Sequence, residues 1–171
     1  METQETQQEM TMPKVEPQKE HEWLQILVGE WTMEDEKAAE SGQPAATPWT
    51  ESGRSLHGLW ILVEGQGETP GGSAATTVMT LGYDPRKERF VGTFIGSFMT
   101  HLWIYEGTLD ASGKILTLDT EGPDMSTPGR MAKYKDVIEI KSDDHRVLTS
   151  RMQGEDGEWR EFMTAHYRRK K

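Results

Sequence analysis

From Glu30 to the end of the chain, polar and apolar side chains alternate with the period of two that is typical of β-strands. No stretch of helical periodicity interrupts this series, so alternating βαβ units are excluded and an up-and-down meander is favoured. An open sheet of so many strands would expose unpaired edges, which closure into a barrel removes. We therefore expect an all-β fold, a single antiparallel up-and-down β-barrel of about ten strands. The expected strands are residues 30–38, 49–57, 60–66, 76–84, 88–97, 100–109, 114–121, 131–140, 145–152 and 158–168.

The segment before the strands has a different character. Residues 1–18 are rich in Glu, Gln and Thr and bury too little apolar surface to fold, so we expect a disordered acidic tail. Residues 19–171 are then the barrel domain. Trp23, Leu24, Leu27 and Val28 recur at helical spacing, which predicts one short amphipathic helix over residues 18–28. Gly29 is expected to end this helix as its C-terminal cap.

Composition excludes several classes of protein. The chain has no cysteine, which rules out disulfides, thiolate metal sites and a cysteine nucleophile. No apolar run reaches the ~18 residues of a membrane helix, and the first residues lack the basic start and apolar core of a secretory signal. A cytoplasmic location without a membrane partner is therefore expected. The net charge is −10, and no basic face with interleaved aromatic residues is present, so a nucleic-acid partner is not expected.

Six short segments together carry a specific combination of residues. They are His21…Leu24…Leu27-Val28-Gly29-Glu30-Trp31, Leu81-Gly82-Tyr83-Asp84-Pro85, Gly92-Thr93-Phe94, Thr100-His101 with Tyr105-Glu106-Gly107-Thr108-Leu109-Asp110, Leu116-Thr117-Leu118 and Tyr134-Lys135-Asp136-Val137. In this order they resemble a bacterial family known only as domain-of-unknown-function family 1579, over roughly residues 20–169. The chain departs from the family pattern at Gly96 and at His166, where the resemblance leads us to expect acids.

The resemblance implies a lipocalin-like barrel, of the calycin or fatty-acid-binding-protein type, and no settled activity. In calycin-type barrels a Gly-x-Trp on the first strand closes the floor, and an Arg from the last strand packs on the indole. Gly29, Trp31 and Arg168 (or Arg169) are in the matching places. Such an Arg–Trp contact is worth about 0.5–2 kcal/mol, and its role would be structural.

The run from Thr100 to Glu106 is the densest cluster of side chains that can do chemistry. On a strand, His101, Trp103 and Tyr105 share one face, and Leu102, Ile104 and Glu106 share the other. A turn with Gly113 as a left-handed bulge would send the aromatic face outward, whereas a two-residue loop would turn it into the barrel. Burial of Trp103 favours the inward arrangement, and the sequence leaves both open.

The candidate ligand-binding residues follow from this cluster and from charged residues on neighbouring strands. His101 is a candidate general base or ligand-binding group, and Tyr105 a candidate hydrogen-bond donor. Glu64 shares a face with Trp60 and Leu62, which makes it a candidate buried carboxylate with an arginine partner. The full set is Arg54, Glu64, Thr100, His101, Trp103, Tyr105 and Arg151. In each case ordinary packing or a solvated strand end is the competing interpretation.

No metal or cofactor is expected. The five histidines show no ligand spacing such as His-x-x-x-His. A haem needs only one axial ligand, and His166 on the last strand is the alternative candidate for it.

Three functions remain open at this point. The leading hypothesis is a protein that binds a small, mainly apolar or amphipathic molecule inside the barrel, through apolar walls and a few polar anchors. The second is an enzyme, decarboxylase-like or isomerase-like, that uses acid–base residues in the same cavity, by analogy of fold alone. The third is an interaction module with a filled barrel, in which an outward aromatic strand around Trp103 forms a homodimer.

Overall fold

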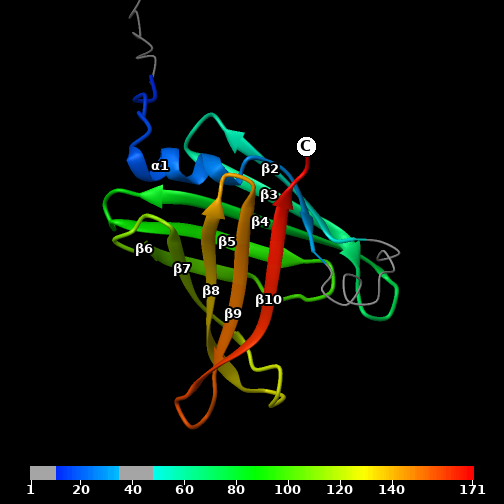
Figure 1. Ribbon diagram of the computed structural model, residues 1–171. Helices are drawn as coiled ribbons and strands as arrows, with labels where there is room; N and C mark the ends of the chain where they lie inside the picture. Colours follow the sequence, from blue (N-terminus) through cyan, green and yellow to red (C-terminus); the bar gives the residue numbers. More distant parts are fainter. Residues whose placement is uncertain (1–10, 35–47) are drawn as a thin grey trace, which may run out of the picture.

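The computed structural model describes residues 11–34 and 48–171, which form a closed barrel of ten antiparallel strands (Figure 1). Each strand pairs with the next one in sequence, and β10 pairs with β1, so the predicted meander and its closure are confirmed. Residues 1–10 of the expected tail and 35–38 of the first expected strand lie outside the described residues. The strands are β1 (Gly29–Met33), β2 (Thr50–Leu56), β3 (Trp60–Glu68), β4 (Ala74–Asp84), β5 (Arg89–Gly96), β6 (Trp103–Leu109), β7 (Ile115–Pro123), β8 (Met131–Ser142), β9 (His145–Gln153) and β10 (Trp159–Arg169).

The predicted N-terminal helix lies across one end of the barrel (Figure 1). It consists of α1 (Lys19–Leu24) and a single 3₁₀ turn, η1 (Gln25–Leu27). Leu24 and Leu27 are fully buried against the strands, and the Trp23 indole donates a 2.7 Å hydrogen bond to the Gly113 carbonyl. Neither helix in the described part of the chain is long and apolar enough to cross a membrane. We call the half of the barrel nearest α1 the helix half and the opposite half the far half.

Gly29 has a different role from the helix cap that the sequence suggested. The 3₁₀ turn ends at Leu27 and Val28 is already extended, so Gly29 is the first residue of β1, with φ at +120°. A Cβ at this position would lie 2.5 Å from Nη1 of Arg169. Glycine is therefore required both for the backbone conformation and for the space that the arginine fills.

The floor of the barrel is formed by Trp31 and Arg169, not by Arg168. The guanidinium carbon of Arg169 lies 4.3 Å from the indole centroid. The same side chain donates to the carbonyls of Val28 at 2.5 Å and Ile26 at 3.0 Å, which fastens η1 to the barrel. Arg169 is the direct partner of Trp31 in the β1–β10 ladder and shares its face. The alternation sends Arg168 outward, where it forms an ion pair with Glu34 at 2.6 Å.

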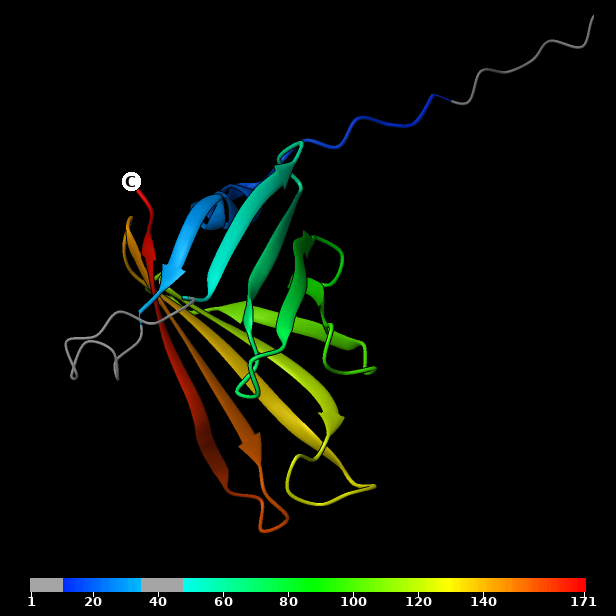
Figure 2. The same cartoon turned by 90° about the vertical axis from the view of Figure 1, so that its right-hand side faces the viewer.

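The two halves of the barrel are packed differently. In the helix half, inward side chains form a closed core of Leu24, Leu27, Ile61, Val63, Leu81, Phe90, Tyr105, Leu116, Leu118 and Ile138. In the far half, inward side chains remain accessible, as shown by Met163, which shares the inward face with its ladder partner Ser150 and is 40% exposed. Figure 2 shows the yellow-to-red strands β8–β10 diverging from the green strands towards this end. Solvent therefore reaches inward side chains in the far half.

Candidate ligand-binding site

Strand β6 turns its aromatic face into the barrel. Trp103 pairs with Phe94, and Tyr105 pairs with Gly92, and this face of β5 points into the core. Ile104, on the opposite face of β6, is 62% exposed. The turn from Asp110 to Gly113 forms, with Gly113 at a φ of +71°, but the register differs from the one expected for it, because Leu109 and not Thr108 pairs with Leu116. The outward aromatic strand on which the homodimer hypothesis was based is thus absent from β6, and the dimer itself stays untested.

A row of aromatic rings crosses the far half from β6 to β10. The Trp103 ring lies 4.9 Å from Tyr134, which in turn lies 6.0 Å from Phe162, both edge-to-face. Trp103 reaches Tyr134 by lying over Gly122 of β7, where a Cβ would come within 2.1 Å of the indole. The β-bulge at Phe162 aims its ring at this row. These rings provide an apolar wall that a ligand can contact.

His101 bridges β6 and β7 at the point where their ladder has ended. Pairing between the two strands covers residues 106–109 and 116–119. Beyond it, the His101 Nε2 lies 2.9 Å from the Glu121 carbonyl, and the imidazole packs edge-to-face on Trp103 at 4.8 Å. Thr100, the preceding candidate, is exposed in the loop before β6. We call this unpaired stretch the seam.

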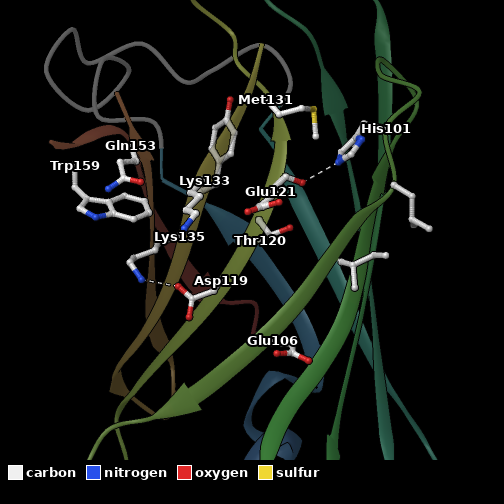
Figure 3. Close-up of a pocket in the computed structure, with 13 residues that line it drawn as sticks. His101, Glu106, Asp119, Thr120, Glu121, Met131, Lys133, Lys135, Gln153 and Trp159 are labelled. Atoms are coloured by element: carbon white, nitrogen blue, oxygen red, sulfur yellow. Dashed lines mark hydrogen bonds and ion pairs between the residues drawn. The ribbon is translucent and has the colours of Figure 1, made fainter. Parts of the chain in front are cut away.

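A cleft of about 710 Å³ opens at the seam (Figure 3). Most of its lining side chains lie on the outer face, but Thr120 and Tyr134 belong to the inward face of β7 and β8. The Thr120 side chain is 8% exposed, and its hydroxyl has no hydrogen-bond partner among the described residues. The cleft thus contacts residues of both faces. Its lining consists of His101, Leu102, Ile104, Glu106, Asp119, Thr120, Glu121, Met131, Lys133, Tyr134, Lys135, Gln153 and Trp159.

Asp136 is a carboxylate inside the barrel that receives hydrogen bonds from neutral groups. It faces inward between Leu118 of β7 and Ser150 of β9. The Ser150 hydroxyl donates to it at 2.6 Å, and the Tyr105 hydroxyl donates to its other oxygen. Burial raises the pKa of Asp136, and burial together with the Asp136 charge raises the pKa of Tyr105. No ion pair joins Asp136 to a basic side chain in the described ranges.

Replacing Asp136 with asparagine is expected to change how stability depends on pH. An unfolded aspartate has a pKa near 3.9, and burial raises this pKa in the folded protein. Between the unfolded-state pKa and the folded-state pKa of Asp136, the folded protein keeps the proton that the unfolded chain has lost. The contribution of Asp136 to stability is therefore present at low pH and is lost as the pH rises through the folded-state pKa. Relative to wild type, Asp136→Asn should therefore gain stability with rising pH and then level off. Urea unfolding at a series of pH values measures this, and a pH-independent difference would contradict it.

A second buried polar group lies closer to the floor. Arg146 and Glu51 form an ion pair at 3.0 Å, with side chains only 4% and 14% exposed. The guanidinium carbon also lies 4.8 Å from the Trp31 ring and 4.2 Å from the Tyr167 ring. Burial and the Glu51 carboxylate raise the pKa of Tyr167. The Arg146 charge is therefore balanced by Glu51 and covered by aromatic rings.

Three of the candidate residues face outward and are not brought to this site. Glu64 accepts a 2.7 Å hydrogen bond from Gln66, Arg151 lies 4.0 Å from Glu161, and Arg54 is exposed. Glu64 does share a face with Trp60, as the alternation predicts, but that face is the outer one. The Trp60 indole lies outside because Gly82 of β4 leaves a flat surface beneath it, where a Cβ would come within 2.5 Å of the ring.

Sequence reasoning missed Glu51, Asp136, Arg146, Ser150 and Tyr167. Two of them, Asp136 and Arg146, can be identified from the alternation of inward and outward side chains along their strands. Asp136 lies two residues from Tyr134 and from Ile138, and Arg146 lies two residues from Leu148. Each charged residue therefore stands on the apolar face of its strand, where a buried charge requires a partner or a function.

His166, the haem candidate, lies on the outer face of β10, where its Nδ1 is 2.9 Å from Nε2 of His145. Burial and the neighbouring Arg168 and His166 lower the pKa of His145. In the described ranges, no group of three or more His, Asp or Glu side chains gathers in a way that holds a metal ion. Haem binding stays a prediction that the geometry does not test.

The sequence of this chain matches a known protein family. Residues 16–169 match the model of DUF1579, a family described as proteins of unknown function. The chain belongs to this family. None of the curated proteins matches the chain. The DUF1579 match spans α1 and all ten strands, which confirms the predicted resemblance.

Within this DUF1579 chain, the two departures predicted from the resemblance lie on opposite faces. Gly96 faces inward, and a Cβ there would lie 3.0 Å from the Phe98 ring, so the ring takes the place of a side chain at position 96. His166 faces outward. The two positions therefore do not contribute to one site.

Proposed function

We propose that this protein binds one small, mainly apolar molecule inside the far half of the barrel, and that the cleft at the seam is its entrance. The cleft carries this proposal, because it opens where the β6–β7 ladder is interrupted and is lined by inward Thr120 and Tyr134 as well as by outer residues. The cleft has a volume of about 710 Å³, which is enough to admit a small molecule.

The chemistry of the walls supports an apolar ligand with few polar contacts. The aromatic row of Trp103, Tyr134 and Phe162 is one wall, and Met163 is an adaptable apolar side chain within reach of the same space. The polar groups are few and lie at fixed positions, as expected of sites in which apolar walls supply affinity and polar groups set orientation.

Binding of N-phenyl-1-naphthylamine, an uncharged fluorophore at neutral pH, tests the proposal. We expect saturable binding at one site per chain. Met163→Trp fills the far half and is expected to weaken binding by about tenfold, because an occupied volume excludes the probe. Met125→Trp is the matched control, since Met125 is exposed in the loop between β7 and β8 and its replacement should leave binding unchanged. Absence of saturable binding, or equal binding by the two variants, would contradict the proposal.

An acid–base enzyme in the same cavity is a second candidate, favoured by the Tyr105–Asp136 hydrogen bond. Both groups are held inside the barrel with raised pKa values, which is a common property of residues that transfer protons. A binding protein would return its ligand chemically unchanged after long incubation, whereas an enzyme would convert it and lose that activity in Tyr105→Phe.

A further inference from the structure

Among the described residues, the carboxylates of Glu51 and Asp136 both face the interior of the barrel, in unlike surroundings. Glu51 faces Arg146 at 3.0 Å and also interacts with the Tyr167 hydroxyl. Asp136 accepts hydrogen bonds from Tyr105 and Ser150, both of which are neutral. One carboxylate is therefore electrically balanced by the protein and the other is not.

The balanced pair is a poor site for an anionic ligand. The Arg146 guanidinium already has its countercharge in Glu51 and lies over the rings of Trp31 and Tyr167. A ligand carboxylate at this point would have to displace Glu51, which would leave that acid buried without a partner. Leaving a buried charge unpaired costs several kcal/mol. Fatty-acid-like ligands are thus disfavoured.

Asp136 has the opposite property. The groups that face it are Tyr105 from β6, Leu118 from β7 and Ser150 from β9, none of which is cationic. An ionised carboxylate in this apolar setting gains a large stabilisation from any cation that reaches it, because the local dielectric is low. A cation supplied by a ligand would complete the site.

Asp136 also lies next to the entrance. In the β7–β8 ladder the pair Thr120–Tyr134, which lines the cleft, is followed on the same face by the pair Leu118–Asp136. Successive inward positions on a strand are about 7 Å apart. Beyond Asp136 the inward residue Ile138 is part of the closed core. Asp136, which is half-buried, therefore lies at the boundary between the pair that lines the cleft and the closed core of Tyr105, Leu118 and Ile138.

We propose that Asp136 is the anchor for a protonated amine, so that the ligand class is an apolar or amphipathic amine whose ammonium group contacts Asp136 and whose tail lies along Trp103, Tyr134 and Phe162. This inference rests on the proposed function and names its ligand class. Tyr105 and Ser150 act as positioning residues that hold the carboxylate through its two oxygens.

Titration calorimetry tests the inference with three decyl compounds, the two charged ones below their micelle concentrations and the alcohol below its solubility limit. n-Decylammonium, n-decanol and n-decanoate share one tail and differ only in the charge of the head group. We expect decylammonium to bind at least about tenfold more tightly than decanol, because it pairs with the Asp136 carboxylate away from bulk water, and decanoate to bind most weakly. Asp136→Asn is expected to reduce decylammonium binding to the level of decanol and to leave decanol binding unchanged.

Asp143→Asn is the matched control, since Asp143 is exposed in the turn between β8 and β9 and does not line the cleft. It removes the same charge outside the barrel and should preserve the preference for the amine. Equal or tighter binding of decanoate, or a preference for the amine that survives Asp136→Asn or is lost in Asp143→Asn, would overturn the inference while the proposed function stands. Absence of binding by decanol and by N-phenyl-1-naphthylamine would instead remove the proposed function.

Discussion

Replacing Arg146 with methionine is expected to lower the free energy of unfolding by about 3–5 kcal/mol, because it leaves Glu51 buried without its countercharge. The ion pair is 3.0 Å long and both side chains are almost inaccessible, so solvent screens it weakly. Methionine retains much of the volume that packs on Trp31 and Tyr167, which keeps the cavity term small. Urea unfolding at pH 7 measures the loss.

The control for this prediction is the double variant Arg146→Met with Glu51→Leu. Replacement of a whole buried ion pair by apolar residues of similar size is often neutral, so the double variant is expected to recover most of the lost stability. If the double variant is as unstable as Arg146→Met, the loss comes from packing and not from an unpaired charge.

Replacing Trp31 with alanine is expected to cost about 3–5 kcal/mol, as is usual for a fully buried aromatic residue. The indole is 1% exposed and contacts both Arg146 and Arg169. It also donates a 3.3 Å hydrogen bond to the Leu27 carbonyl, so its loss loosens η1 as well as the floor of the barrel.

Trp159→Ala is the matched control, because it removes the same side chain from the rim of the cleft, where Trp159 is 37% exposed and contacts Lys135. Its cost is expected to stay near 1 kcal/mol, in the range of surface positions. Thermal or urea unfolding of the two variants side by side measures the contrast, and equal losses would show that Trp31 does not organise the floor.

The fold follows from the sequence because its determinants are local. Alternation of polar and apolar side chains sets the strands, and the absence of a helical segment after Glu30 excludes crossover connections. The packing of an arginine on Trp31 at the floor of the barrel was also predicted, but the sequence did not decide between Arg168 and Arg169. Only the β1–β10 register, which places Arg169 opposite Trp31, decides between them.

The site was less predictable because it depends on which face of each strand points inward. Glu64 and Trp60 share a face as predicted, yet that face is outside, since Gly82 accommodates the indole there. Asp136 meets Tyr105 only through the closure of β6, β7 and β8, across 31 positions of sequence. Pairings of this kind arise from long-range register, which single-strand patterns do not contain.

Methionine-methyl NMR during titration with N-phenyl-1-naphthylamine tests the central claim most directly, because methionines of the described strands lie on both faces of the barrel. If the ligand lies inside the far half, the methyl signals of inward Met79 and Met163 shift, and that of Met12, which is exposed in the segment before α1, does not. A shift confined to Met131, which lines the cleft on the outer face, would place the ligand on the surface and contradict the account.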